Sequence, residues 1–494
     1  MSIENEADDA TVTAFGYRQQ LRRSLGFLSM FTISFSVISI TTGIFVNFGF
    51  GITNFGPAAI WTWPIVVVGQ LLLSLVLAEL GSRVPIAGIG YQWGARLVGP
   101  SLGWIIAFEI LAAFMLASGG ETLLLISPLI ASVLNLDASN TLLMTLISVG
   151  VFVLVALINI FSVRLTARIN NVSLVTEVVG TVVLGLILLI VFLSHPNHGI
   201  DFLFSTSNPA RNPAWYGFFL AMLIGIFTIE GMETASDLGE EGIGVRRAVP
   251  RAIIYSVLIS GVLGMITLFC VALAIPNLEK TASDAAPIAY IASYWLGPIV
   301  SKIFVVCIIY SVFALIVVSV AAMARLVFSL SRDNMLPASG FLVRVNDRTR
   351  TPVNAIVVTS LLFIAVMLFA AARPNAYAIL IASTPILAYS GYLLIVLAYA
   401  FRRDRIAHLP TGFDLGRWAV PVFALTVVWL VGALLVLTLP SAFHDGDKTA
   451  AGVFVVAIIW YFVWLRRRIK RGEAGRSLLH PSGMGAAPDA STGA

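Results

Sequence analysis

Long apolar runs separated by short polar segments form the pattern of this 494-residue chain. A helix needs about 20 consecutive, mostly apolar residues to cross a bilayer, and runs of about this length recur throughout. A transmembrane barrel would instead show short segments of alternating polarity. The pattern therefore predicts an all-α polytopic membrane protein with twelve transmembrane helices, at residues 26–50, 57–82, 100–131, 141–162, 169–194, 214–238, 251–275, 299–330, 352–372, 375–401, 418–440 and 449–466.

The composition supports this interpretation. The chain is 59% hydrophobic and 11% charged, with a mean hydropathy of +0.95, whereas soluble proteins carry about 25% charged residues. Residues 1–25 are polar and partly acidic, so we expect an N-terminal tail and no cleavable signal peptide. Residues 467–494 form a C-terminal tail, which becomes rich in Gly, Ala and Ser after Arg471 and is predicted to be disordered.

Positive charge is distributed unevenly between the two sides of the predicted membrane region. Segments on the N-terminal side hold 25 of the 30 Lys and Arg residues. The remaining five lie on the other side and are Arg211, Lys280, Lys302, Arg373 and Lys448. Loops rich in Lys and Arg stay in the cytoplasm. We therefore predict a plasma-membrane protein with both termini in the cytoplasm. The net charge of +5 thus reflects topology, and no nucleic-acid partner is expected.

The sequence does not provide the residues that ATP-driven transport, metal binding or enzymatic catalysis would require. No GxxxxGK[ST] loop occurs in the chain, so transport driven by ATP is not encoded. Cys270 and Cys307 lie in apolar runs and are predicted to be buried free thiols. The five histidines all fall outside the centres of the predicted spans. We therefore expect no enzyme, no bound metal and no organic cofactor.

The sixth predicted span is interrupted at its centre. Glu230, Gly231 and Glu233 follow an apolar run that begins near residue 214. A charged residue at bilayer depth costs roughly 2.5–3.5 kcal/mol on insertion scales, so it is retained in a polar or water-filled setting. The stretch 227–241 is therefore where we expect the functional chemistry.

The first span has a matching irregularity. Its centre, which includes Ser39, Thr41, Thr42 and Gly43, is a poor helix core. Interrupted helices at corresponding places in two halves of a chain indicate a transporter site built from inverted repeats. The alternative is that each glycine only allows close helix packing. The carboxylates beside Gly231 favour the transporter interpretation.

Four blocks of sequence resemble the amino acid–polyamine–organocation (APC) superfamily of permeases, and within it the amino acid/choline transporter group. The blocks are residues 78–100, 167–180, 231–253 and 324–337. The resemblance spans roughly residues 15–470. It implies a leucine-transporter-type fold, with inverted five-helix repeats at 26–194 and 214–401 and two additional helices within 418–466.

The resemblance also implies a substrate site between the interrupted spans one and six. Free N–H groups at a helix start can hold a carboxylate, and by resemblance that start is at Thr41, Thr42 and Gly43. Backbone carbonyls around Phe227 to Glu230 would contact the amine, with Phe227 closing over the substrate or, alternatively, packing as an ordinary aromatic. The predicted substrate-binding residues are Ser39, Thr41, Thr42, Gly43, Phe227, Ile229, Glu230 and Gly231.

Intramembrane carboxyl groups are the candidates for coupling transport to an ion. Glu177 lies where the resemblance places a lysine in some proton-coupled relatives, and Glu230 and Glu233 flank the sixth-span interruption. A carboxyl group in an apolar setting can exchange a proton near neutral pH, so H⁺ is favoured over Na⁺. The alternatives are an ion pair between Glu177 and Arg325, and a purely structural Glu230.

Several other polar residues could line the transport path or could be structural. Glu233, Asp237 and Glu240 would share one helical face and could line an exit path, or the last two could pair with Arg246, Arg247 or Arg251. Two other residues, Glu121 and Ser319, could reach the site, while Glu109 is interpreted as structural.

The sequence therefore predicts a secondary active transporter that imports an amino acid or a related amine, coupled to protons. The alternatives are a choline, ethanolamine or polyamine transporter, or an amino acid exchanger. The expected partners are the small-molecule substrate and the lipid bilayer, and the oligomeric state is left open.

Overall fold

The computed structural model describes residues 12–475 except positions 14, 18, 22, 162, 285, 374, 375 and 377. Within this part of the chain the protein is all-helical and forms no β-strand; a single isolated bridge joins Leu25 to Gly242. Most of the predicted N-terminal tail and residues 476–494 of the predicted C-terminal tail lie outside the described residues.

The long helices coincide with the predicted apolar segments, and short helices, such as those at Ile89–Leu97, Leu278–Ser283, Ser339–Leu342 and Asp404–Ala407, lie between them. The first half contains α2 (Phe27–Ile38), α3 (Ile40–Phe55), α4 (Thr62–Arg83), α5 (Ile89–Leu97), α6 (Pro100–Gly120), α7 (Ser127–Leu134), α8 (Thr141–Phe161), α9 (Val163–Glu177) and α10 (Leu184–Ser194). Single π-helical turns, at Glu121–Ile126 and Val178–Val183, join α6 to α7 and α9 to α10.

The second half continues in the same way. Its helices are α11 (Ala214–Ala221), α12 (Leu223–Thr228), α13 (Thr234–Asp237), α14 (Val245–Leu273), α15 (Leu278–Ser283), α16 (Pro287–Arg332), α17 (Ser339–Leu342), α18 (Val353–Ala371), α19 (Ser383–Arg402), α20 (Asp404–Ala407), α21 (Ala419–Thr438), α22 (His444–Trp460) and α23 (Arg466–Lys470). The predicted span at 299–330 begins earlier than expected, because α16 includes an initial segment that is kinked at Gly297, where φ is 78°.

Ten helical stretches in the described chain are long and apolar enough to cross a membrane. The first of them, Phe27–Arg83, is 57 residues long and includes α2, α3 and α4. Ala214–Thr228 is apolar but shorter than a full span. The protein is therefore a multi-pass membrane protein, and the difference from the predicted twelve spans lies in these two regions.

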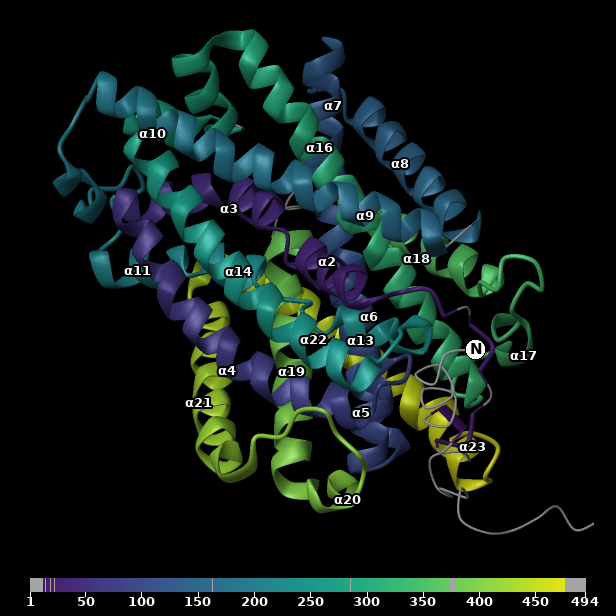
Figure 1. The fold of residues 1–494 in the computed structure, drawn as a ribbon. Helices are drawn as coiled ribbons and strands as arrows, with labels where there is room; N and C mark the ends of the chain where they lie inside the picture. The colour runs from purple at the N-terminus through teal and green to yellow at the C-terminus, as the bar shows by residue number, and fades with distance from the viewer. Residues whose placement is uncertain are drawn as a thin grey trace, which may run out of the picture.

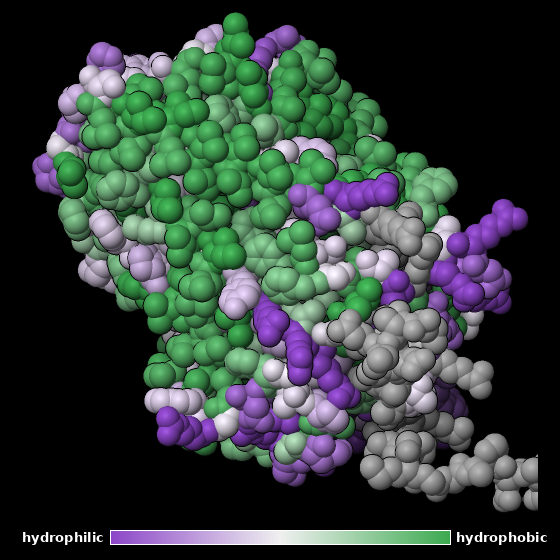
Figure 2. Space-filling model, in the orientation of Figure 1, coloured by the Kyte–Doolittle hydropathy of each residue, from purple (hydrophilic) through white to green (hydrophobic). Residues whose placement is uncertain are grey.

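The hydrophobic surface fits a bilayer environment. A broad apolar surface covers the upper and middle part of the molecule, and hydrophilic residues gather at opposite ends (Figure 2). Leu142, Leu193 and Val428 are each about two-thirds exposed on outer helices. The inner helices are far more enclosed, since 78% of the apolar window of Ile379–Arg402 is buried, against 17% for Ser441–Lys470. The most enclosed stretches are therefore Ile379–Arg402, Phe27–Arg83 and Pro287–Arg332, the last two each with 67% of their window buried.

Both described ends of the chain lie on the same side of the molecule. The hydroxyl of Tyr17 donates to the carboxylate of Asp333 at 3.0 Å, and the backbone N–H of Gly475 donates to the Asp333 carbonyl at 2.8 Å. We call this side the terminal face. Its existence agrees with the prediction that the two termini share a side.

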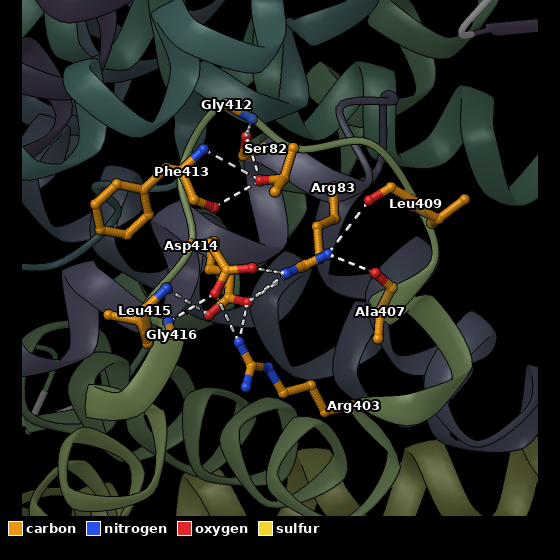
Figure 3. Close-up of polar contacts among 12 residues, drawn as sticks. Ser82, Arg83, Arg403, Ala407, Leu409, Gly412, Phe413, Asp414, Leu415 and Gly416 are labelled. Carbon is orange, nitrogen blue, oxygen red and sulfur yellow. Dashed lines mark hydrogen bonds and ion pairs between the residues drawn. The ribbon is translucent and has the colours of Figure 1, made fainter.

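A charged cluster near the terminal face connects α4 to the segment between α19 and α21. Glu79 accepts from Arg83 at 2.9 Å and from Arg403 at 2.7 Å. Both arginines also reach Asp414, as the close-up shows (Figure 3). The cluster holds the end of α4 in place at the end of α19.

Both cysteines are free thiols. Cys270 is buried and Cys307 is half-buried, so the prediction of burial holds fully only for Cys270.

Candidate functional site

The first transmembrane segment is interrupted between α2 and α3. Ser39 adopts φ 32° and ψ 82°, a left-handed conformation, and its side-chain oxygen accepts from the backbone N–H of Thr42 at 3.3 Å. Ser39 thereby caps the N-terminus of α3. The prediction that the break includes Gly43 is wrong, because the helix resumes at Ile40 and the N–H of Gly43 already bonds to the carbonyl of Ser39 at 3.0 Å.

The second interruption lies where the sequence predicts it. α12 ends at Thr228, α13 begins at Thr234, and Gly231 between them has φ 76°. A positive φ favours glycine, which has no Cβ to clash with the backbone. The prediction of a break at Gly231 is confirmed.

Side chains from other helices satisfy the backbone groups that this break releases. Gln70 of α4 donates to the carbonyl of Ile229. The N–H of Gly231 donates to the hydroxyl of Tyr392 of α19 at 3.0 Å. Ser34 of α2 donates to the carbonyl of Met232 at 2.6 Å. The break is therefore a fixed feature of the fold, held from three sides.

The two breaks lie against each other near the centre of the molecule (Figure 1). A Cβ added at Gly43 would lie 2.0 Å from Oγ1 of Thr228, and one added at Gly231 would lie 2.4 Å from Cγ1 of Val37. Such distances are impossible for real atoms, so each glycine permits the close approach of the opposite broken segment. From the sequence, helix interruption and close helix packing were alternative interpretations of these glycines. In the structure the two features occur together.

A cavity lies between the two breaks and is closed by α6, α16 and α19. The space that a water molecule could occupy is about 40 Å³, so the cavity is narrow in this conformation. Its walls mix apolar and polar side chains and consist of Val37, Ile38, Ser39, Thr42, Gly43, Ile110, Ala113, Phe114, Ala117, Ser118, Glu121, Phe227, Thr228, Glu230, Gly231, Glu233, Leu315, Ser319, Ala388 and Tyr392.

Most of the predicted site residues line this cavity. The structure brings together Ser39, Thr42, Gly43, Phe227, Glu230, Gly231 and Glu233. Thr41 and Ile229 are fully buried and do not line it. The carbonyl of Ile229 accepts a hydrogen bond from Gln70, so this one of the carbonyls expected to contact an amine already has a partner within the protein.

Glu177 lies beside the cavity, at the N-terminus of α3. Its Oε1 accepts from the backbone N–H of Thr41 at 3.3 Å, and polar groups of Ser39 and Ile40 adjoin the same carboxylate. The side chain is fully buried. The alternative of an ion pair with Arg325 is wrong, because Arg325 pairs with Glu241 at 2.8 Å.

Three carboxyl groups from different segments line the cavity. Glu233 accepts from the hydroxyl of Tyr392 at 3.0 Å. Glu121 is 4% exposed, and within the described chain its Oε2 and that of Glu230 have no hydrogen-bond partner. No Lys, Arg or His is among the described residues of the wall. The cavity therefore offers carboxyl oxygens as hydrogen-bond acceptors in a largely apolar enclosure.

The acidic stripe predicted below the break does not form. α13 contains only four residues and a 3-10 turn follows at Gly239–Glu241, so the acids do not share one helical face. Glu240 is buried and pairs with Arg332 at 3.0 Å, which replaces the predicted alternatives of Arg246, Arg247 and Arg251. Glu240 and Glu241 thus join the segment after α13 to α16 by ion pairs.

Two residues that shape the site, Gln70 and Tyr392, were missed in the sequence. Both are polar residues within apolar spans, which was the available indication. Glu121 and Ser319, which the sequence marked as able to reach the site, do line it. Glu109 lies apart, buried against Ser390, whose hydroxyl donates to it at 3.4 Å.

A multi-pass helical protein with a polar cavity between two interrupted helices has the architecture of a membrane permease. A family model described as "Amino acid permease" matches residues 25–464. The chain therefore belongs to the amino acid permease family of the APC superfamily, and it is a transporter rather than an enzyme.

Individual relatives cover nearly the whole chain. Amino-acid permease BAT1 of Arabidopsis thaliana is 26% identical over 464 residues, which is 88% of this chain and 89% of the relative. An uncharacterized amino-acid permease of Schizosaccharomyces pombe is 24% identical and covers 95% and 88% of the two chains. A putative polyamine transporter of Candida albicans is 23% identical and covers 94% and 88%. These three relatives are named as transporters of amino acids or of polyamines.

Proposed function

We propose that this protein is a secondary active transporter that imports a small amine-bearing solute, an amino acid or a related amine, by proton coupling. The observation that carries the proposal is the acid-lined cavity between two facing helix breaks. Family membership and the relatives' names support the same range of solutes.

The proposed topology has twelve crossings with both termini in the cytoplasm of a plasma-membrane protein. Phe27–Arg83 would cross twice, through α2–α3 and then α4, and α11–α13 would form one further, broken crossing. Together with the other nine stretches this gives twelve. The inverted repeats would span 26–194 and 214–401, so that each repeat opens with its broken helix, and 418–466 would add two crossings.

The amine of the solute is proposed to bind among Glu230, Glu233 and the ring of Phe227. All three residues line the cavity. A carboxylate attracts an ammonium group strongly where little water competes, and the face of an aromatic ring adds to the attraction. Ser39, Thr42, Gly43 and Gly231 complete the wall on the side of the breaks.

Proton coupling is proposed to use the carboxyl groups Glu177, Glu230 and Glu233. Each of them lies at a helix break, so a change in its charge acts where the two broken helices meet. A membrane carboxyl in such a position is typical of proton relays. Exchange of one amine for another is the second candidate, because both solutes could use the same acidic cavity.

Uptake of labelled solute into proteoliposomes tests the proposal. With an inward pH gradient, the wild-type protein is expected to accumulate solute, and Glu233→Gln is expected to lose the stimulation by the gradient. Glu279→Gln, an exposed glutamate in α15, is the matched control and should retain it. Flux that ignores the gradient but requires internal solute would replace proton symport by exchange, and absence of flux would refute transport.

A further inference from the structure

The N-terminus of α3 is the place where a substrate carboxylate would be expected to bind. The first N–H groups of a helix have no partner within the helix and attract negative charge. Here they are already used by the protein. Thr42 N–H donates to Ser39 Oγ, and Gly43 N–H donates to the Ser39 carbonyl. Thr41 N–H donates to Glu177, and the N–H of Ile40 adjoins the same carboxylate.

Glu177 reaches this helix end from the end of α9. It is fully buried and does not line the cavity wall. A solute carboxylate could bind the same N–H groups only by displacing the carboxyl group of Glu177 from them.

The side chains of the cavity wall also disfavour a solute carboxylate. Glu121, Glu230 and Glu233 line it, and the described residues of the wall include no cationic side chain. The buried Oε2 atoms of Glu121 and Glu230 have no hydrogen-bond partner within the described chain. A buried carboxylate without a partner is costly, so these oxygens are available to a cationic ligand.

We infer that this site takes an organic cation that carries one or more ammonium groups and no carboxylate. Glu177 supplies, from within the protein, the carboxylate that α3 would otherwise take from an amino acid. It is therefore a specificity-determining residue. This inference rests on the proposed transport function and selects one class of solute within it.

Matched pairs of solutes test this directly, since each amine differs from its amino acid only by the carboxylate. Suitable pairs are 1,5-diaminopentane with lysine, 1,4-diaminobutane with ornithine, agmatine with arginine, and tyramine with tyrosine. The purified full-length protein is titrated with each compound while its thermal unfolding is followed, because a ligand of the folded state raises the unfolding temperature. We expect the wild-type protein to bind at least one amine about tenfold or more tightly than its amino acid, which is ~1.4 kcal/mol.

Two variants separate a role in specificity from a role in stability. Glu177→Ala frees the α3 N-terminus, so the ratio of amine to amino acid affinity should fall by about tenfold, with amino acid binding gained. Glu109→Gln is the control, because Glu109 is buried but does not line the cavity, and its ratio should match that of the wild type. The unfolding temperature without ligand shows whether each variant is folded.

The outcomes distinguish the two proposals. Equal or tighter binding of the amino acid in every pair by the wild-type protein would overturn the inference and leave the transport function standing. An unchanged ratio in folded Glu177→Ala would also overturn it. If that variant does not fold, the ratios of amine to amino acid affinity measured for the wild-type protein still decide whether the inference holds. Absence of binding and of uptake for every compound would overturn both proposals.

Discussion

At the scale of single residues, the site depends on groups that allow two broken helices to touch. Gly43 lies against Thr228, and Gly231 lies against Val37. Ser39 adopts a left-handed conformation and caps the helix that follows. None of these residues contributes charge, yet each fixes where the charged residues of the cavity lie.

Replacing Gly43 by alanine tests the contact between the breaks. The new Cβ would meet the Thr228 side chain at 2.0 Å, so the helices must separate. We expect a loss of about 1–3 kcal/mol of stability, as for other overpacked sites, together with reduced uptake. Denaturant or thermal unfolding in detergent measures the first and proteoliposome flux the second.

Gly150→Ala is the matched control for this substitution. Gly150 also lies within a helix, α8, but nothing lies within 4 Å of an added Cβ. Its stability should stay the same or rise slightly, because alanine favours helix. Equal effects of the two substitutions would mean that the predicted clash does not exist.

At the scale of elements, the sequence predicts the two interrupted segments but not what holds them. Apolar length and the run Glu230–Gly231 locate the sixth-span break, since charge and glycine both oppose a continuous helix. The position of the first break, at Ser39, depends on a serine cap and on Glu177 from α9. The contact with Glu177 joins residues 136 positions apart, and helical periodicity carries no information about it.

The failure of the predicted acidic stripe has a similar cause. Glu233, Asp237 and Glu240 have helical spacing, but tertiary ion pairs outweigh local periodicity. Arg332 pairs with Glu240, and Arg325 with Glu241. A sequence shows that these arginines exist and cannot show which acid they reach. The break itself, which needs only local chemistry, was predictable.

The charged cluster of α4 gives a prediction about pH. Partial burial alone would raise the pKa of Asp414, but the N–H of Gly416 and the cations Arg83 and Arg403 outweigh it and lower that pKa. A carboxyl with a lowered folded-state pKa stabilises the protein above its unfolded pKa of about 3.9. That contribution is lost as the pH falls through the folded pKa.

Asp414→Asn should therefore destabilise the protein at neutral pH and have no effect in acid. We expect less than about 1 kcal/mol, because the side chain is 44% exposed and exposed ion pairs contribute little. Thermal unfolding from pH 7 to pH 3 measures the difference from wild type. The exposed residue Asp404 offers a control, Asp404→Asn. A difference that grows in acid would contradict the assignment.

At the scale of the whole molecule, the direction of transport depends on which side of the membrane the terminal face occupies. Asp333 contacts both described chain ends there. The excess of Lys and Arg on this side favours the cytoplasm. The same charge count was already available in the sequence, because topology is set by composition along the chain and not by packing.

Single cysteines at exposed positions test the orientation. In a chain without Cys270 and Cys307, Arg348→Cys would report on the terminal face and Lys280→Cys on the opposite face. In intact cells, a membrane-impermeant thiol reagent should label the second and leave the first unlabelled until the membrane is permeabilised. The reverse pattern would place the termini outside and reject the proposed topology.

The central claim is that solute crosses the membrane through the cavity between the two helix breaks. Its most direct test is the initial rate of labelled amine uptake into proteoliposomes for Ala388→Leu, which places bulk in the cavity wall. Ala398→Leu is the matched control on the same helix α19, with 7% exposure against 6%, and does not line the cavity. We predict that Ala388→Leu abolishes uptake while folded Ala398→Leu retains it. Equal uptake by both variants would contradict the account.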